Sequence, residues 1–518
     1  MNTHQRADAE EKSLAEVFDM VGFGRFQMRL LLIAGCGFMA DSIEVGVVTF
    51  LERKIPEEWP EAEGWALNAL SMSVFGTKLL GSCIWGSLSD RLGRRRAFLL
   101  ANVFLLVTGC LSAASPSYTW LVVARGLVGL AIGGVVIPFD NLAESVPEKY
   151  SSTMCYAIEY AWTIGTLYTN ALAAAIMETW GWRIYLLLTA LPILLACIGY
   201  LYLEESPLWL LDRGYDDDAL ETLRRIAAVN NRELGNIALV SYAHEAEPNC
   251  TELLAPSLRR QLLSLSGIWC LGLFGYYGAS MASGFLFESG GTMDYTEVLF
   301  TSFGEIVGTT AVLLASFRIS AATVQPWCYL LSCLGCIGVA VAKLFSGSNI
   351  LIAVLAFLVR AGCMGGTAAT WVLTPAAFPT HIRSTAHSLL FAWGSVGSLL
   401  ATLWPSKTSA TVIMGTYAVA NLACVVLAVW QDRGMAPRGA FDSLISDLQA
   451  SNLDRRARSS LARSSRAASR TSTVTGRPSN MSRPSWPLLP SRTVTMSGQC
   501  SERDPEPRGV VERGMPAT

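Results

Sequence analysis

Three ionisable residues lie inside the first two long apolar runs of the chain. Asp41 and Glu44 are three residues apart, so on a helix they share one face. Lys78 lies near the middle of the second run, at a similar depth, and is their expected partner. A charge at the centre of a bilayer costs about 2.5–3.5 kcal/mol unless it is paired or hydrated. We therefore hypothesise that this cluster binds a cation or a proton, with Lys78 setting the charge state of the acids. The alternative is a buried ion pair that locks two helices together.

Further charges lie in later apolar runs. Glu305 and Arg360 match in depth, and we favour a pair between them, with a carboxylate substrate as the other partner open to Arg360. Arg125 lies in the outer third of its run, where a long side chain can snorkel, and a gating or pairing role is the alternative. Asp140 and Glu159 lie near the run ends that are predicted below to face the cytoplasm, which favours a latch over substrate binding.

Aromatic residues near the middle of apolar runs are candidates for a cavity wall. An aromatic ring there can stack on a substrate ring or hold an organic cation, although packing and interface anchoring are the commoner roles. Tyr276 and Tyr277, beside Gly278, are the strongest candidates. The others are Trp162, Trp371 and Trp393.

The elements that position these residues follow from composition. The chain has 518 residues, of which 52% are hydrophobic and only 15% charged, whereas a soluble domain carries about 25% charged residues. The net charge of −2 gives no indication of nucleic-acid binding. We find no His/Cys metal pattern, phosphate-binding loop or nucleophile elbow, and therefore expect no metal, no cofactor and no enzymatic activity.

Twelve apolar runs are long enough to be membrane helices. They predict an all-α membrane protein with an N-terminal cytoplasmic segment, two six-helix bundles joined by a linker with short helices, and a disordered Ser/Arg-rich tail. The predicted ranges are 1–26, 27–203, 204–262, 263–430 and 431–518. The predicted spans are Gln27–Phe50, Trp65–Leu88, Ala97–Ala114, Trp120–Phe139, Met154–Met177, Ile184–Leu203, Leu263–Phe287, Val298–Phe317, Trp327–Leu344, Ile350–Val372, Ser388–Trp404 and Ala410–Val429.

The distribution of Lys and Arg predicts the orientation in the membrane. Cytoplasmic loops carry an excess of these residues. With twelve crossings, the amino terminus, the loop after the second span, the linker and the tail are all basic and all fall on one side. We therefore expect both termini to be cytoplasmic.

A motif between the second and third spans carries a family resemblance. The segment Gly86–Arg96 reads GSLSDRLGRRR, with its Gly, Asp and Arg residues at Gly86, Asp90, Arg91, Gly93 and Arg94. It resembles the signature loop of the major facilitator superfamily. The halves also echo each other, because Arg125–Gly126 in the fourth span corresponds to Arg360–Ala361 in the tenth. The resemblance implies two pseudo-symmetric six-helix bundles around a central cavity.

Other segments narrow the resemblance to a subgroup. They are Val21–Gln27, Met39–Glu44, Glu205–Leu211, Tyr276–Gly278 and Thr374–Pro379. Together they resemble the transporter-like proteins related to synaptic vesicle glycoproteins, akin to organic-cation and niacin transporters in the sugar-porter neighbourhood. The resemblance covers about Ser13 to Gly434 and implies small organic ions as substrates.

In the family, charges near the cytoplasmic ends form a latch that holds the outward-open state. Here the resemblance assigns Glu144, Glu205 and Arg383 to the latch, with Asp140 and Arg125. Several expected latch residues are missing, especially in the second half. Arg is replaced by Ser151 and Leu208, Glu by Ala376, and only Arg318 remains of the second-half repeat of the loop.

We expect a secondary transporter of a small organic ion that works by alternating access, as a proton-coupled symporter or as a uniporter. The eroded latch favours the alternative, a transport-silent vesicle or receptor-like membrane protein that has retained the fold. The expected location is the plasma membrane or a vesicle or organelle membrane. The expected partners are the lipid bilayer, the substrate and, with coupling, protons. Nothing in the sequence requires an oligomer, so we expect a monomer.

Overall fold

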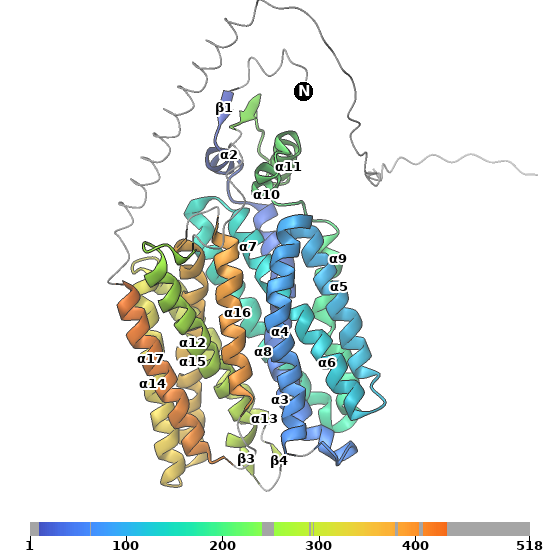
Figure 1. The fold of residues 1–518 in the computed structure, drawn as a ribbon, viewed down its shortest axis with the longest axis vertical. Helices are drawn as coiled ribbons and strands as arrows, with labels where there is room; N and C mark the ends of the chain where they lie inside the picture. Colours follow the sequence, from blue (N-terminus) through green and yellow to red (C-terminus); the bar gives the residue numbers. More distant parts are fainter. Residues whose placement is uncertain are drawn as a thin grey trace, which may run out of the picture. The chain divides into compact units, whose positions relative to one another are not determined.

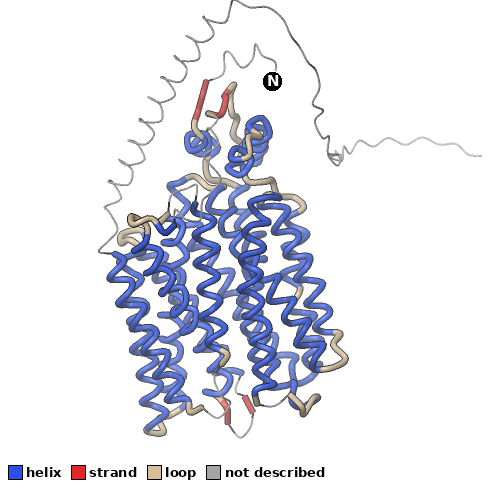
Figure 2. The backbone as a smooth tube through the Cα atoms, in the orientation of Figure 1, coloured by secondary structure: helices blue, strands red, loops and turns tan. Residues whose placement is uncertain are grey.

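The computed structural model describes residues 10–62, 64–240, 253–289, 292–293, 295–378, 382–403 and 408–432. All of them belong to the first of two compact units, Met1–Met435. The predicted tail, apart from its first two residues, lies outside the described residues. Helices make up nearly all of the described chain (Figure 2).

The first half of the chain forms a set of long helices that correspond to the first six predicted spans. Gly181, with φ 78° and ψ 169°, interrupts the longest of them, α8, so that α8 contributes two crossings. The helices are α3 (Arg25–Glu58), α4 (Trp65–Leu92), α5 (Arg94–Ala113), α6 (Tyr118–Ile132) continued by η1 (Gly133–Val135) and α7 (Val136–Glu144), α8 (Glu148–Thr189) and α9 (Leu191–Tyr200).

The second half forms six more long helices. They are α12 (Arg259–Leu286), α13 (Tyr295–Ser316), α14 (Ala321–Leu344), α15 (Asn349–Ala376), α16 (Arg383–Ala401) and α17 (Ala410–Asp432). Ten helical stretches of the described chain are long and apolar enough to cross a membrane. One of the ten contains α8 and α9, and it crosses twice because the chain turns back at Gly181. The α16 helix adds one more crossing, so the predicted twelve-helix membrane fold is confirmed. The residue ranges of the two bundles and the linker stay predictions.

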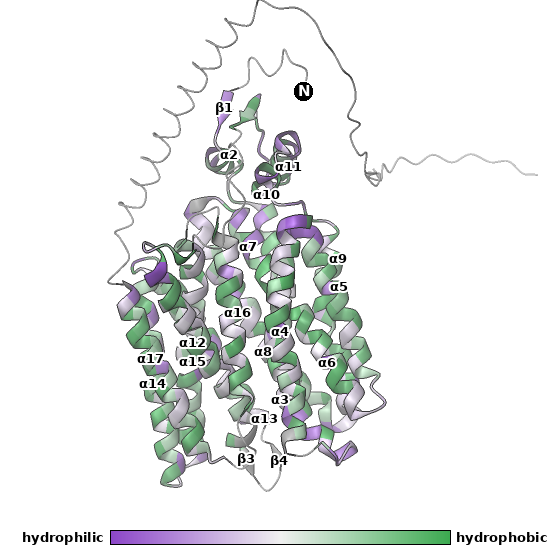
Figure 3. Ribbon diagram, viewed as in Figure 1, coloured by the Kyte–Doolittle hydropathy of each residue, from purple (hydrophilic) through white to green (hydrophobic). Residues whose placement is uncertain are grey.

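Hydropathy follows this arrangement, with apolar residues along the helices and hydrophilic residues concentrated at their ends (Figure 3). Large apolar side chains such as Leu80, Val123, Leu314 and Val426 are exposed on the outer helix faces. Exposed apolar surface of this extent is typical of a lipid-facing protein. We call the end at which α4 ends and α5 begins the Arg94 end, and the end at which α3 ends the Glu58 end.

Short elements lie outside the long helices. The linker helix predicted at Asp216–Ala228 is present as α11 (Asp216–Val229). A three-residue strand carries almost no periodic signal, so the sequence did not predict β1 (Glu10–Lys12), which pairs in parallel with β2 (Ile237–Leu239). The remaining elements are α2 (Leu14–Val21), α10 (Pro207–Asp212), β3 (Glu288–Ser289) and β4 (Thr292–Met293).

Glycines bring the second and fourth helices of each half into close contact. A Cβ atom on Gly129 would collide with the backbone of α4 at Val74, and one on Gly133 with the backbone at Gly81. In the second half, a Cβ atom on Gly308 would collide with the backbone of α15 at Ala361. Small residues let membrane helices approach backbone to backbone, and the recurrence of this contact in both halves agrees with an internal duplication.

The two halves pack against each other along several helices. The α4 helix lies beside α16 (Figure 1), α8 packs on α13 and α12 packs on α3. Direct hydrogen bonds cross this interface, such as the 2.7 Å bond between the hydroxyl groups of Tyr160 on α8 and Thr310 on α13. Side chains on these inner faces therefore contact the opposite half, and these contacts change if the halves separate.

The glycine contacts predict a specific stability effect. Gly129→Ala should destabilise the protein by about 1–3 kcal/mol, because overpacking forces closely packed helices apart. Gly109→Ala is the matched control, since it is also in a membrane helix but a Cβ atom there meets nothing within 4 Å. The measurement is thermal unfolding in detergent. Equal melting temperatures for the two variants would contradict the packing argument.

Candidate functional site

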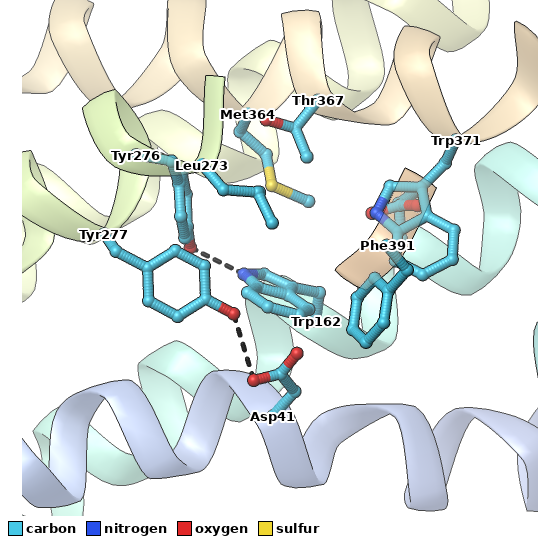
Figure 4. A pocket seen from close by; sticks show the side chains of 10 residues that line it. Asp41, Trp162, Leu273, Tyr276, Tyr277, Met364, Thr367, Trp371 and Phe391 are labelled. Carbon is cyan, nitrogen blue, oxygen red and sulfur yellow. Dashed lines mark hydrogen bonds between the residues drawn. The ribbon is translucent and has the colours of Figure 1, made fainter. Parts of the chain in front are cut away.

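A cavity lies between the two halves, near the middle of the long helices. It is nearly closed in this conformation, because the space open to the centre of a water molecule is about 10 Å³, which is room for about one water molecule. Aromatic rings form much of its wall, and the carboxylate of Asp41 lies beside them (Figure 4). The lining residues are Asp41 from α3, Glu159 and Trp162 from α8, Leu273, Tyr276 and Tyr277 from α12, Met364, Thr367 and Trp371 from α15, and Phe391 from α16.

One edge of the cavity is an ion pair shared by three helices. Lys78 Nζ lies 2.6 Å from Asp41 Oδ2 and donates a 2.8 Å hydrogen bond to the hydroxyl of Tyr277. That hydroxyl donates to Asp41 Oδ1 over 3.0 Å. The side chains of Lys78 and Asp41 are 0% and 1% exposed. The structure therefore brings Asp41, Lys78 and Tyr277 together, and the tyrosine connects a first-half ion pair to a second-half helix.

Glu44 is not part of that cluster, and its predicted pairing with Lys78 is wrong. It forms an ion pair with Arg125 of α6 instead. The three residues from Asp41 to Glu44 rotate the side chain by about 60° and move it ~4.5 Å along the helix. That displacement directs Glu44 to α6, whereas Asp41 faces α4. Arg125 is 1% exposed, so it pairs within the helix bundle and does not snorkel to the interface.

The second half holds an equivalent buried pair. Arg360 Nη2 lies 2.5 Å from Glu305 Oε1, as the sequence predicted. The same oxygen accepts a 2.8 Å hydrogen bond from the hydroxyl of Tyr276, which itself accepts a 2.6 Å bond from the indole of Trp162. The adjacent tyrosines of α12 thus serve two ion pairs, Tyr276 in the second half and Tyr277 in the first.

The structure corrects the position of Glu159. The sequence placed Glu159 near the cytoplasmic end of its span, because the predicted span begins at Met154. In fact α8 begins at Glu148, which puts Glu159 eleven residues, or ~17 Å, into the helix. Glu159 is 1% exposed and lines the cavity. It therefore belongs to the cavity and not to a latch.

A network of charges joins the signature loop to the rest of the first half at the Arg94 end. Arg94 bonds Asp90 Oδ1 over 2.6 Å and Glu144 Oε1 over 3.3 Å. The other oxygen of Glu144 accepts a 2.9 Å bond from the hydroxyl of Ser206. These bonds connect the loop between α4 and α5, the end of α7 and the start of α10, so this network stabilises the first half.

Gly93 and Glu205 meet in the same network. Gly93 has φ +96°, and a Cβ atom there would collide with the carboxylate of Glu205. That carboxylate accepts hydrogen bonds from the backbone N–H groups of Arg95 (2.9 Å) and Ser206 (3.1 Å). Burial raises the pKa of Glu205, although these hydrogen bonds oppose the shift. Glycine is thus required at position 93 both for its backbone conformation and for the close approach of Glu205.

His387, which the sequence analysis did not single out, links the halves at the Arg94 end. Its Nδ1 lies 2.8 Å from Asp140 Oδ1, and the side chain is fully buried among Phe139, Trp269 and Trp371. The available signal was a histidine one residue before the predicted eleventh span. Asp140 thus has a partner across the interface, and its latch role stays a prediction.

The other predicted latch residues are placed as follows. A Cβ atom on Gly86 would meet the hydroxyl of Ser388 on α16, so the loop starts against the second half. Arg91 is exposed and forms no ion pair with the described residues. The side chain of Arg383 lies outside the described residues. Trp393 was a candidate for the cavity wall, but it is 46% exposed on the outer face and is not in the cavity.

Contacts across the halves also occur at the Glu58 end. The hydroxyl of Tyr295 on α13 donates a 3.1 Å hydrogen bond to Glu178 on α8. Nearer the cavity, the amide of Asn170 on α8 donates a 2.7 Å bond to the hydroxyl of Ser302 on α13. Side chains of both halves therefore meet on either side of the cavity, towards the Arg94 end and towards the Glu58 end.

In the described part of the chain, no group of three or more His, Cys, Asp or Glu side chains could hold a metal ion. Cys333 and Cys336 are free and buried within a membrane helix. The chemistry of the site is therefore that of buried ion pairs, hydroxyl groups and aromatic faces.

Twelve membrane helices in two packed halves, with a largely aromatic cavity between them, are typical of the major facilitator transporters. A model of the sugar (and other) transporter family matches residues 21–431. The chain belongs to this family and is an integral multi-pass membrane protein.

Curated relatives place the chain in the subgroup that the sequence resembled. It is 30% identical to the synaptic vesicle 2-related protein of Xenopus laevis, over 80% of this chain and 79% of the relative. It is 28% identical to the putative transporter svop-1 of Caenorhabditis elegans, over 81% and 85%. It is 26% identical to organic cation/carnitine transporter 7 of Arabidopsis thaliana, over 75% and 87%.

Solved structures show the same fold. The proton:xylose symporter XylE, bound to 6-bromo-6-deoxy-D-glucose, aligns with a TM-score of 0.61 and 17% identity, covering 77% of this chain and 94% of that one. The partially occluded inward-open conformation of XylE from E. coli aligns with a TM-score of 0.59 and 17% identity, covering 80% and 98%. At this identity the likeness concerns the fold alone.

The first prediction from the site concerns Gly93. Gly93→Ala should lower the melting temperature more than Gly22→Ala, since both sites have positive φ but only the Gly93 side chain would collide with Glu205. The backbone conformation alone costs about 1–2 kcal/mol in each variant. The measurement is thermal unfolding in detergent. A smaller loss for Gly93→Ala than for Gly22→Ala would contradict the assigned contact.

The second prediction concerns the ion pair of Asp41 and Lys78. Lys78→Met should destabilise the protein by about 3–5 kcal/mol, because it leaves a buried carboxylate without its cation. The double variant Asp41→Asn/Lys78→Met should regain most of that loss, since neither buried charge remains. The measurement is thermal unfolding of the two variants and the parent. A double variant as unstable as Lys78→Met would refute the pairing.

Proposed function

We propose that the protein is a secondary transporter that carries a small organic ion through the cavity by alternating access, coupled to a proton at Asp41. The observation that carries the proposal is the ion pair between Asp41 and Lys78. It is buried in the first half, it borders the cavity, and its remaining hydrogen-bonding partner is Tyr277 of the second half. A charge in this position is costly to keep unless it acts in the transport cycle.

Alternating access requires that each end of the cavity can open separately. The contacts between halves are suited to this, because those near one end involve different residues from those near the other. Towards the Arg94 end, His387 bonds Asp140, while towards the Glu58 end Tyr295 bonds Glu178 and Asn170 bonds Ser302. Contacts at both ends are formed in the conformation described, which supports an occluded intermediate of this cycle.

The proposed coupling step is protonation of an Asp41 carboxylate oxygen. A neutral Asp41 no longer attracts the ammonium group of Lys78, and its hydrogen bond from Tyr277 loses the charge that strengthens it. A hydrogen bond to a charged group contributes about 1.5–3 kcal/mol. Losing that contribution weakens the link between α3 and α12, so the proton and the opening of the halves become thermodynamically linked.

The relatives support transport as the function. One of them is named a putative transporter, and another an organic cation/carnitine transporter. The Lys and Arg distribution supports a cytoplasmic location for the Arg94 end and for both termini. We propose a monomer as the transporting unit, because each chain holds a complete cavity lined by both halves.

A transport-silent membrane protein is the rival function. The feature that favours it is the incomplete latch of the second half. There Ala376 replaces the Glu expected from the family, and Arg318 is the residue that remains of the repeated loop motif. The contact of His387 with Asp140 supports transport, because it links the halves at the Arg94 end without the missing latch residues.

The test is uptake by purified protein in proteoliposomes. A panel of small organic cations and carboxylates is offered with and without an inward proton gradient. We expect saturable uptake of at least one class, accelerated severalfold by the gradient. Asp41→Asn should remove the acceleration, while Glu221→Gln, on the exposed face of α11, should behave as the parent.

Two outcomes would count against the proposal. Uptake by Asp41→Asn with an undiminished response to the gradient would exclude Asp41 as the coupling site. No uptake of any panel member by folded protein would favour the transport-silent alternative.

A further inference from the structure

Glu159 is a buried acid at the cavity wall with no cation beside it among the described residues. Asp41 pairs with Lys78, Glu44 with Arg125 and Glu305 with Arg360, whereas Glu159 forms no ion pair with the described residues. Its Oε1 atom has no hydrogen-bond partner in the described structure either. An unpartnered carboxylate that is 1% exposed and lines a cavity points to a ligand that completes it.

The charge of the surrounding groups gives the sign of that ligand. The three ion pairs are neutral in sum, since each holds one acid and one base, and Asp41 is their member that lines the cavity. Ionised Glu159 therefore leaves one negative charge uncompensated at the cavity wall. A bound cation would remove the imbalance, whereas a bound anion would double it at short range, where a low dielectric strengthens the repulsion.

The walls beside Glu159 are also suited to a cation. Trp162 is three residues further along α8 and lies on the same helix face. The rings of Trp371, Tyr276 and Tyr277 line the same cavity as Trp162 (Figure 4). Aromatic faces attract ammonium groups within about 6 Å of the ring centre. The site already holds such a contact, because Lys78 Nζ lies 5.0 Å from the ring centre of Tyr277.

We propose that Glu159 is the counter-ion that selects the substrate, and that the substrate is a protonated amine on a small apolar skeleton. The inference rests on the proposed transport function and specifies the substrate class of the same cavity. The ammonium group donates a hydrogen bond to Glu159 Oε1, and the skeleton lies against the aromatic rings. Asp41 is the proton site and Glu159 the substrate site, so the two carboxylates have separate roles.

The cavity volume limits the size of the skeleton. In the conformation described the cavity has room for about one water molecule, so a substrate enters only when the halves separate, and a small skeleton requires the least separation. The amine nitrogen must reach Glu159 while its apolar part remains among the rings. A compact arylalkylamine satisfies both conditions and serves as the probe.

The experiment measures binding without requiring transport. Purified protein in detergent is titrated with three compounds of similar size that differ in charge: 2-phenylethylamine, 2-phenylethanol and phenylacetate. Ligand that binds the folded state raises the melting temperature. We expect a saturable rise with the amine only, and an affinity at least tenfold weaker for the alcohol and the carboxylate.

Variants of Glu159 connect the effect to this residue. Glu159→Gln retains the shape of the side chain and removes its charge, so amine affinity should fall at least tenfold. Glu159→Asp retains the charge with a shorter reach and should give an intermediate loss. Glu221→Gln is the matched control, because it removes a surface carboxylate far from the cavity, and it should bind the amine as the parent does.

The outcomes separate this inference from the proposed function. Preferential binding of phenylacetate, no binding of the amine, or unchanged amine affinity in Glu159→Gln would each overturn the inference. Uptake of a carboxylate in proteoliposomes without amine binding would overturn it while transport stands. Glu159-dependent amine binding without any uptake would support the inference and reject the transport proposal.

Discussion

The structure depends on one constraint, which is that an ionised side chain inside a membrane must meet an opposite charge. Removing two charges from water costs several kcal/mol per ion, and only close geometry with extra hydrogen bonds offsets that cost. The chain meets this requirement at Asp41 and Lys78, where Tyr277 contributes the additional hydrogen bonds. Because the pair joins α3 to α4 and the tyrosine belongs to α12, the neutralisation of one charge also determines how the halves contact each other.

Close helix packing makes such short ion pairs attainable. Gly308 lies three residues after Glu305, and its approach to the backbone of α15 brings Glu305 within 2.5 Å of Arg360. Gly81, three residues after Lys78, also lies against a neighbouring helix, but that helix is α6, whereas Lys78 pairs with Asp41 on α3. In the second half the glycine and the charges are thus parts of one arrangement, because α13 and α15 held further apart would separate Glu305 from Arg360.

The two halves share this architecture but differ at the Arg94 end. In the first half, Arg94 and Glu144 join three segments through charged hydrogen bonds, whereas the second half has Ala376 and an exposed Arg318 at the family positions. The link between the halves at this end is formed by His387 and Asp140.

The sequence by itself determined the membrane fold, the twelve crossings and the signature loop, because hydropathy and charge segregation are properties of the chain alone. It also predicted the pairing of Glu305 with Arg360, since equal depth was sufficient there. Only the tertiary structure decided that Glu44 pairs with Arg125, because the choice of partner depends on the direction a side chain takes around its helix. The same holds for Glu159: apolar periodicity does not show that a helix continues through polar residues, and that extension placed its carboxylate in the cavity.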